Sequence, residues 1–393
     1  MVDHDGHTHV GTLGASSRAV LRELLISGPL HRATLARRLG HSAASLTKIT
    51  RPLLDSGVLT TDETLRSDLP GRPGTPLDIT AEHHTFAGFK ITGSSVHGVM
   101  TNARGEVRRG WDAALSTTDP EHVVALIVDQ VKEMEAERPL QAIGIGSAGM
   151  MRRYDDRVRQ NQYLGWDDVP LAEIITERTG RPTVVSVDTR ALTAGVHWSG
   201  PGRGLTDFAV VTIGVGVGLG LVIDDHLHAG TDGLAGMIGH LPVNGNGPLC
   251  AAGHRGCVSS FLNSSSITSS VALAHSRSAM TLEEVVELAD DGDPAAVHAF
   301  DQAGVALGTL IFQVISILGL QHVILTGDGL PALRHLRAPM DRSLRAHLDP
   351  HRSPPEIAVF HSDFDEWARG AAVLACQWLL LSSTPPTPRK ARS

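Results

Sequence analysis

Between residues 42 and 51 the chain reads SAASLTKITR, in which hydroxyl and basic side chains alternate with apolar ones. Hydroxyl groups donate and accept hydrogen bonds, and lysine and arginine donate to anionic oxygens. These are the groups that bind base edges in the major groove of DNA, and its phosphates. We expect Thr47 and Lys48 to reach base edges or phosphates, and Arg51 to reach a phosphate. The residues expected to face outward are Ser42, Ala43, Ser45, Thr47, Lys48 and Arg51.

The apolar residues around this segment predict a helix-turn-helix. A first helix begins near Ser16 and ends at Ser27-Gly28-Pro29, a short second helix follows, and a third ends at Gly57. Small residues where the two later helices touch, and apolar residues that seat the third, fall at the required spacing: Ala36, Gly40, Leu46 and Ile49. In such units the start of the last helix enters the major groove.

Residues 58–80 predict two strands joined by a tip rich in proline and glycine. The tip, Gly71-Arg72-Pro73-Gly74, places Arg72 where it can enter a narrow minor groove. Residues 13–81 are therefore predicted to be a winged helix-turn-helix DNA-binding domain. The alternative is a winged helix that binds proteins, but the exposed face is short, polar and basic, which favours double-stranded DNA.

Charge is unevenly distributed along the chain. The whole chain has 34 Lys and Arg against 42 Asp and Glu, or −8, whereas residues 1–80 have nine against eight, or +1, which leaves −9 for the rest. Three cysteines provide no disulfide framework. The first residues lack the pattern of a secretory signal, and no apolar run approaches the roughly 18 residues of a membrane span. We expect a cytoplasmic protein that does not bind membranes.

From residue 84 to 383 strands and helices alternate, which indicates an α/β domain. Within it, residues 233–267 read GLAGMIGHLPVNGNGPLCAAGHRGCVSSFLNSSSI. This stretch resembles the signature of the ROK family of repressors, open reading frames and sugar kinases, in which a Gly-His pair precedes a cysteine cluster closed by Arg-Gly-Cys. A winged helix ahead of such a body is the arrangement of the family's repressors.

The resemblance implies a two-lobed actin/hexokinase-like fold with a ligand between the lobes. We place the lobe boundary near residue 200 and expect a last helix, 363–381, to return to the first lobe. This domain would also carry the contacts between subunits. Residues 1–12 and 384–393 are expected to be disordered tails.

The resemblance also implies zinc. In the family the histidine and three cysteines bind a structural zinc ion; His240, Cys250 and Cys257 match three of these positions, but Ala252 replaces the middle cysteine. His254, in the same loop, is a candidate fourth ligand. Because structural zinc prefers four nitrogen or sulfur ligands, the alternative is an empty site with small buried cysteines. We expect zinc.

The family's phosphate-handling motifs are altered. The kinase loop Asp-x-Gly-Gly-Thr reads Lys90 to Ser94 here, so an ammonium replaces the magnesium-binding acid and Thr92 crowds the loop. The turn Gly214–Gly218 is retained, and Asp188 matches the family's catalytic base. Asp328, inserted in a late glycine pair, would repel a nucleotide phosphate. Since phosphoryl transfer depends on metal and positioning, we expect a sensor without enzymatic activity or an ATP and magnesium requirement.

The sugar-binding positions are only partly retained. The chain keeps Asp188 and His240, while the other family positions carry Val187, Met237, Ser259 and Tyr163. Loss of carboxylates and amides reduces the match to a polyol. We expect a modified or less polar sugar, an unrelated metabolite or no ligand. Asp188 has a second possible role, as the N-cap of the helix that follows it.

Together these features predict a ligand-responsive transcriptional regulator, which we expect to be a repressor. We expect it to bind an inverted-repeat operator as a homodimer or homotetramer. Two alternatives remain open: a sugar kinase with an appended DNA-binding domain, and a regulator that responds to a protein partner instead of a small molecule. Neither the operator nor the effector follows from the sequence.

Overall fold

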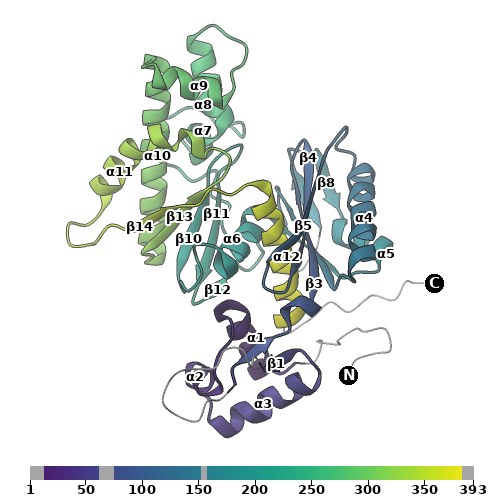
Figure 1. Ribbon diagram of the computed structural model, residues 1–393. Helices are drawn as coiled ribbons and strands as arrows, with labels where there is room; N and C mark the ends of the chain where they lie inside the picture. The colour runs from purple at the N-terminus through teal and green to yellow at the C-terminus, as the bar shows by residue number, and fades with distance from the viewer. Residues whose placement is uncertain (1–12, 62–74, 152–156, 383–393) are drawn as a thin grey trace. The chain divides into compact units, whose positions relative to one another are not determined.

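The computed structural model describes residues 13–61, 75–151 and 157–382. The chain divides into two compact units (Figure 1). Unit 1 contains the chain up to Gly204 and again from Phe364, and unit 2 contains Leu205–Asp363. The predicted tails and the turn that carries Arg72 lie outside the described residues.

The N-terminal part of unit 1 consists of three helices and a two-stranded antiparallel sheet: α1 (Ala15–Ser27), α2 (Arg32–Arg38), α3 (Ala43–Asp55), β1 (Leu59–Thr61) and β2 (Leu77–Ile79). Helix α3 begins where the Ser42 hydroxyl accepts a hydrogen bond from the backbone N–H of Ser45 at 3.1 Å. The apolar faces of the helices meet in one small core, whose fully buried members include Leu21, Leu24, Leu35, Leu46 and Leu77. The predicted helices are thus confirmed.

The rest of unit 1 is built on a five-stranded sheet in the order β5-β4-β3-β6-β9. Strands β3 to β5 are antiparallel, and β6 and β9 are parallel to β3. Their bounds are β3 (Thr85–Ile91), β4 (Ser95–Asn102), β5 (Val107–Ala114), β6 (Ala142–Ser147) and β9 (Thr183–Val187); the hairpin β7 (Val158–Asn161) and β8 (Trp166–Val169) stands apart. The unit also has helices α4 (Pro120–Glu137), α5 (Leu171–Thr179), α6 (Asp188–Ser199) and α12 (Phe364–Leu381), with η1 (Ala81–His83) before β3.

Helices cover both faces of this sheet. Alternate β3 side chains, including Phe89, share a core with α4 and α5. On the other face α12 lies directly on strand glycines: a Cβ on Gly88 would come within 2.0 Å of the Ala368 carbonyl oxygen, and one on Gly144 within 1.8 Å of that of Ala371. Contact this close requires glycine. The last helix is therefore an integral layer of unit 1.

Unit 2 repeats the pairing pattern of the unit 1 sheet, with the order β12-β11-β10-β13-β14. Again three strands are antiparallel and two more are parallel to the innermost of them. The strands are β10 (Phe208–Thr212), β11 (Gly218–Ile223), β12 (His226–Leu227), β13 (His322–Thr326) and β14 (Glu356–Val359). The helices are α7 (Val258–Leu262), α8 (Ser264–Ala274), α9 (Leu282–Asp290), α10 (Pro294–Leu318), η2 (Leu330–Ala332) and α11 (Leu333–His347).

Helix α10 forms the centre of unit 2. Among the described residues it is the single helix long and apolar enough to cross a membrane. Its side chains nevertheless fill the core of unit 2, where Phe300, Leu307 and Ile311 are buried. A Cβ on Gly308 would lie 2.4 Å from the Met340 carbonyl oxygen, so α10 and α11 pack closely. Its apolar character is explained by this packing.

Candidate functional site

Helix α3 carries the side chains predicted to read DNA. Ser42, Thr47, Lys48 and Arg51 are exposed and Ser45 is half-buried. The Ser42 hydroxyl is already engaged as the helix cap, and the Thr47 hydroxyl donates to the Ala43 carbonyl at 2.9 Å. Arg51 lies 3.9 Å from the Asp55 carboxylate, with both side chains largely exposed. Lys48 and Arg51 are therefore the cations that this surface offers to a partner.

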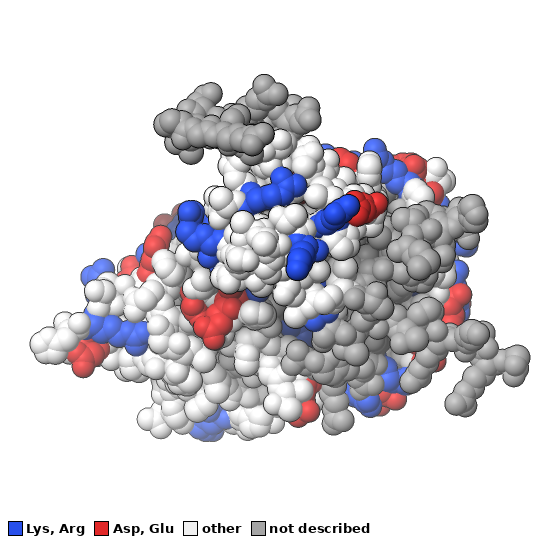
Figure 2. Space-filling view, turned by 90° about the horizontal axis from the view of Figure 1, so that it is seen from below, with Lys and Arg blue, Asp and Glu red and all other residues white. Residues whose placement is uncertain are grey.

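The surface around α3 is positively charged. Residues 13–61 contain seven basic and two acidic side chains, although residues 1–80 as a whole are near neutral. Figure 2, which views the molecule from the side of these helices, shows basic side chains spread over the near face. The basic set is Arg18, Arg22, Arg32, Arg37, Arg38, Lys48 and Arg51. One acidic residue, Glu23, is paired with Arg38, so the excess of positive charge remains.

In unit 1 the two altered kinase positions are joined. The ammonium of Lys90 in β3 forms an ion pair with Oδ2 of Asp188, and it lies 4.8 Å from the centre of the Trp367 ring on α12. The side chains of Lys90 and Asp188 are 7% and 14% exposed. The lysine therefore holds the carboxylate that would act as a base, and it stands where the kinases place a metal-binding acid. Trp367 was not anticipated from the sequence.

The capping role considered for Asp188 needs correction. Val187 occupies the N-cap position of α6, and Asp188 is the first helical residue. Its Oδ1 accepts a hydrogen bond from the backbone N–H of Thr189 at 2.7 Å, while Oδ2 is engaged by Lys90. An acidic side chain in the first turn still interacts favourably with the helix dipole. Asp188 thus stabilises the helix start without being its cap.

Thr92 closes the loop that would bind phosphate. Its hydroxyl oxygen accepts hydrogen bonds from the backbone N–H groups of Ser94 and Ser95, at 3.2 and 2.9 Å. Backbone N–H groups in such loops are the usual ligands of phosphate oxygens. Here a side chain of the protein already uses them. The predicted crowding by Thr92 therefore takes the form of an internal hydrogen-bonded turn.

The segment carrying Tyr163 is held by a residue that sequence reasoning missed. Asn161 is buried, and its amide nitrogen donates to the Ser147 hydroxyl and the Ala148 carbonyl. Its Oδ1 accepts from the backbone N–H groups of Tyr163 and Leu164. Tyr163 itself is 40% exposed. An asparagine next to a glycine-containing turn was the available signal, because its side chain can satisfy backbone donors and acceptors.

In unit 2 the inserted Asp328 lies against the surviving glycine-rich turn. A Cβ on Gly214 would come within 1.6 Å of the Oδ1 of Asp328, so the carboxylate fills the space beside this glycine. The backbone N–H of Gly329 donates to the Ile213 carbonyl at 2.8 Å, which fixes the two turns together. The carboxylate that the sequence led us to expect to repel a nucleotide phosphate therefore lies directly beside the glycine-rich turn.

Three of the four predicted metal ligands come together in unit 2. The Nδ1 of His240 lies 3.6 Å from the Sγ of Cys250 and 3.8 Å from the Sγ of Cys257, and all three ligand atoms lie within 4.8 Å of one another. Zinc bonds of about 2.3 Å to sulfur and 2.1 Å to nitrogen, at tetrahedral angles, separate S and N by about 3.6 Å. The residues present fit zinc. They would hold it by two thiolates and one imidazole.

The position of His254 differs from that of a ligand. It is outside the group of three, and its ring packs edge-on against His240 with the centroids 4.6 Å apart.

Partial desolvation would raise the pKa of the Cys250 thiol. Hydrogen bonds from the Ala252 backbone and from Cys257 outweigh this effect and leave the pKa below its ordinary value. A thiol with a lowered pKa more readily supplies the thiolate that zinc requires.

The predicted ligand contacts divide between the two units. Asp188 and Tyr163 belong to unit 1, whereas Met237, His240 and Ser259 belong to unit 2. Met237 is 54% exposed. Ser259 is half-buried, and its backbone N–H donates to the Gly239 carbonyl at 2.8 Å, which brings it next to His240. Within unit 2, Met237 and His240 lie in the loop before α7, and Ser259 lies in the first turn of α7.

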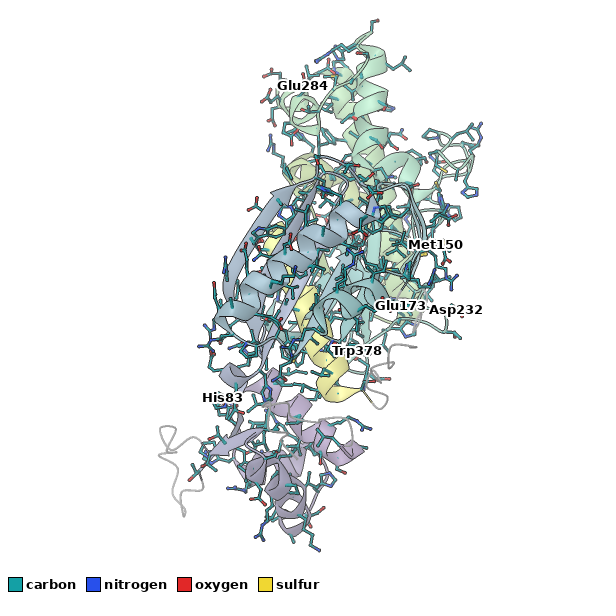
Figure 3. All side chains as sticks on the ribbon, turned by 90° about the vertical axis from the view of Figure 1, so that its right-hand side faces the viewer. His83, Met150, Glu173, Asp232, Glu284 and Trp378 are labelled. Carbon is teal, nitrogen blue, oxygen red and sulfur yellow. The ribbon has the colours of Figure 1, made fainter. Side chains whose placement is uncertain are left out.

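Two arginines that sequence reasoning missed hold the N-terminal helices against the unit 1 sheet. Arg104, in the turn after β4, pairs with Asp78 of β2 and donates to the Leu24 carbonyl at 3.2 Å. Arg203 donates to the Ile26 carbonyl at 2.7 Å. The Leu24 carbonyl also accepts from the backbone N–H of Gly28, so Arg104 adds a second donor there, and both guanidinium groups lie at the C-terminal end of α1, as the helix dipole favours. His83, labelled in Figure 3, lies in η1 between β2 of the N-terminal part and β3 of the sheet.

Comparison with known proteins places the body of the chain in a family. The sequence profile of the ROK family matches residues 86–377. The chain is similar to the xylose repressor of Bacillus subtilis, with 23% identity over 316 residues, which cover 79% of this chain and 81% of the repressor. It is also similar to the glucokinase of Thermotoga maritima, with 32% identity over 185 residues, 47% of this chain and 58% of that enzyme.

Solved structures share the fold. The crystal structure of a ROK family transcriptional regulator, a homologue of the E. coli MLC protein, matches with a TM-score of 0.79 and 23% identity over 95% of this chain and 98% of that chain. A ROK family glucokinase from Streptomyces griseus matches with a TM-score of 0.64 and 25% identity over 75% of this chain and 99% of that chain. The first match includes the N-terminal helices, and the second covers three quarters of the chain. With its profile matched from β3 to α12, this chain belongs to the ROK family.

Proposed function

We propose that this protein is a cytoplasmic, DNA-binding transcriptional repressor whose ROK body senses a small molecule and performs no phosphoryl transfer. The N-terminal region acts as a winged helix-turn-helix that reads double-stranded DNA through α3 and through Arg72. Two copies, or two pairs of copies, bind an inverted repeat.

The observation that carries the proposal is the basic surface of α3 ahead of a ROK body. It presents Lys48 and Arg51 beside exposed hydroxyls, which is the donor set for major-groove and phosphate contacts. The similarity to xylose repressors over about four fifths of the chain supports the same function. The likeness to the Thermotoga glucokinase covers less than half of it.

The proposal that the body senses a ligand without transferring phosphate rests on the residues at the positions of the kinase phosphate motifs. Lys90 neutralises Asp188, the Thr92 hydroxyl uses the loop N–H groups, and Asp328 fills the space beside Gly214. We propose that Asp188 and His240 contact the effector, with Tyr163, Met237 and Ser259 contributing the less polar surroundings. A modified or less polar sugar fits this set better than an unmodified hexose. Zinc held by His240, Cys250 and Cys257 would stabilise the surrounding loop.

The test is selection of DNA by the full chain from a random double-stranded library, followed by fluorescence anisotropy on the enriched sequence. We expect an inverted repeat with two matching half-sites. Lys48→Ala should relax the selection at one or two base pairs of the enriched sequence, whereas Lys132→Ala on the exposed face of α4 should leave the selection unchanged. Absence of enrichment by the unaltered chain would contradict the proposal.

The kinase alternative is tested separately. Incubation with ATP, magnesium and a panel of hexoses should produce no phosphorylated sugar, and detecting one would restore the kinase interpretation. A thermal-shift screen of metabolites on the full chain then identifies the effector class, because a ligand that binds the folded state raises the melting temperature. The stabilising metabolite should change DNA affinity, and its effect should be lost in Asp188→Ala.

A further inference from the structure

The turn that carries Ala252 is closed by backbone hydrogen bonds. The backbone N–H of Cys250 donates to the His254 carbonyl at 2.8 Å, and that of Gly253 donates to the Cys250 carbonyl at 2.9 Å. Leu249 pairs with Arg255 across the base of the turn. These bonds are made by the backbone, so they do not depend on which side chain stands at position 252. The substitution by alanine therefore removes a thiolate and leaves the frame that would have presented it.

The remaining ligands leave one side uncovered. Cys257 is buried, Cys250 is half-buried and His240 is exposed. Ala252 and His254 are exposed as well. The His254 ring lies edge-on to that of His240, and its nitrogens are outside the group of three ligand atoms. A metal ion held by these three residues would thus meet solvent on the side of Ala252.

We propose that this chain has a three-ligand metal site with an open fourth position, and that this position takes a small thiol from solution. Zinc sites closed by four protein ligands are structural, whereas sites with three keep a place for an exogenous ligand. Two thiolates and a neutral imidazole balance the charge of a divalent ion. A soft thiolate restores the set of three sulfurs and one nitrogen that Ala252 interrupts.

The exchange is a ligand substitution without redox change. With a metal ion held by His240, Cys250 and Cys257, the incoming thiol would release its proton to solvent, and its thiolate would take the position otherwise open to water. Neither the metal nor the cysteines change oxidation state. The step requires Cys250 and Cys257 to remain thiolates throughout, which excludes a disulfide between them.

Cobalt substitution tests this on the full chain, because cobalt(II) reports bound thiolates by near-ultraviolet charge-transfer absorption and tetrahedral geometry by visible bands. The protein is loaded with cobalt under a phosphine reductant and titrated with 2-mercaptoethanol. We expect a saturable rise of about 1.5-fold in the near-ultraviolet band, since a third thiolate joins two. No spectral change, or no cobalt bound, would overturn the proposal.

Two variants assign the result. Ala252→Cys supplies the third thiolate from the chain, so its charge-transfer band should start at the saturated level and ignore the added thiol. His254→Ala should respond as the unaltered chain does. If only His254→Ala responds, then His254 is the fourth ligand and the site is closed. If Ala252→Cys alone binds cobalt, the natural site is empty. Neither reading depends on DNA binding.

Discussion

Lys90 and Asp188 form a largely buried ion pair across two neighbouring elements, β3 and the first turn of α6. Each residue occupies a position at which the related kinases need an acid, one for the metal and one for the base. In this chain the two positions are joined by an ion pair. The stacking of the ammonium against Trp367 extends the same contact to α12.

Asp188→Asn should lower the free energy of unfolding by about 3 kcal/mol, because it leaves a buried ammonium without its counter-charge. Urea denaturation measures this loss. The double variant Lys90→Met with Asp188→Leu should recover much of it, since no unpaired charge remains. As a control, Lys132→Met breaks an exposed pair with Asp129 and should cost less than about 1 kcal/mol. A loss no greater in Asp188→Asn than in the control would refute the structural role.

DNA binding should separate base-reading from phosphate-binding cations. Arg51→Ala should weaken binding to all sequences alike and reduce the salt-dependence slope by about 1, as expected of a phosphate contact. Lys48→Ala should relax discrimination at one or two base pairs. Arg72→Ala should act most on operators with A/T-rich flanks, where the minor groove is narrow. Competition anisotropy at several salt concentrations distinguishes these effects; identical losses for all three variants would show that each only touches phosphate.

Removal of Arg104 should loosen the N-terminal helices from the unit 1 sheet. Arg104→Ala deletes the pair with Asp78 and the donor to the end of α1, so amide exchange in residues 15–27 should accelerate. Arg104→Lys keeps the charge without the two-pronged geometry and should give an intermediate rate. Arg109→Ala, which breaks pairs with Glu133 and Glu137, provides the control. Hydrogen–deuterium exchange followed by mass spectrometry measures the amide exchange rates of the three variants. Unchanged exchange in α1 of Arg104→Ala would show that this arginine does not hold the helix in place.

Acid should destabilise the protein through His84. Burial lowers the pKa of this imidazole below its ordinary 6.5, although the bond to Gln141 opposes the shift. The unfolded chain then binds more protons, so stability is full above about pH 6.5 and is lost as the pH falls toward the folded-state pKa. His84→Gln should flatten the dependence of melting temperature on pH between 7 and 5. The exposed neighbour variant His83→Gln should retain most of the slope, and an equally steep slope in His84→Gln would exclude this residue as the cause.

Local patterns predicted most of the fold, while contacts between distant segments were beyond them. The apolar spacing of Leu21, Leu24 and Leu46 identified the N-terminal helices, because burial on one face leaves a periodic trace. The meeting of His240 with Cys250 and Cys257 followed from the family signature. Nothing in the sequence links Arg104 to Asp78, which lie 26 residues apart on different elements. The Lys90–Asp188 pair spans 98 residues, so each altered position was recognised while their pairing was not.

Because α12 returns to unit 1, the segments that pack together in this unit are translated at widely separated times. Strands β3 and β6 emerge from the ribosome early, yet the helix that lies on Gly88 and Gly144 is made only after all of unit 2. The 217 residues from the end of β6 to the start of α12 take roughly 11–43 s to translate at about 5–20 residues per second. During that time one face of the sheet lacks α12 and has only α6 against it, and α1 lacks a helix that it contacts in the finished molecule. The sheet of unit 1 therefore receives its last covering helix only after unit 2 has been translated, and we expect a chain that ends before α12 to expose the apolar surface that this helix covers.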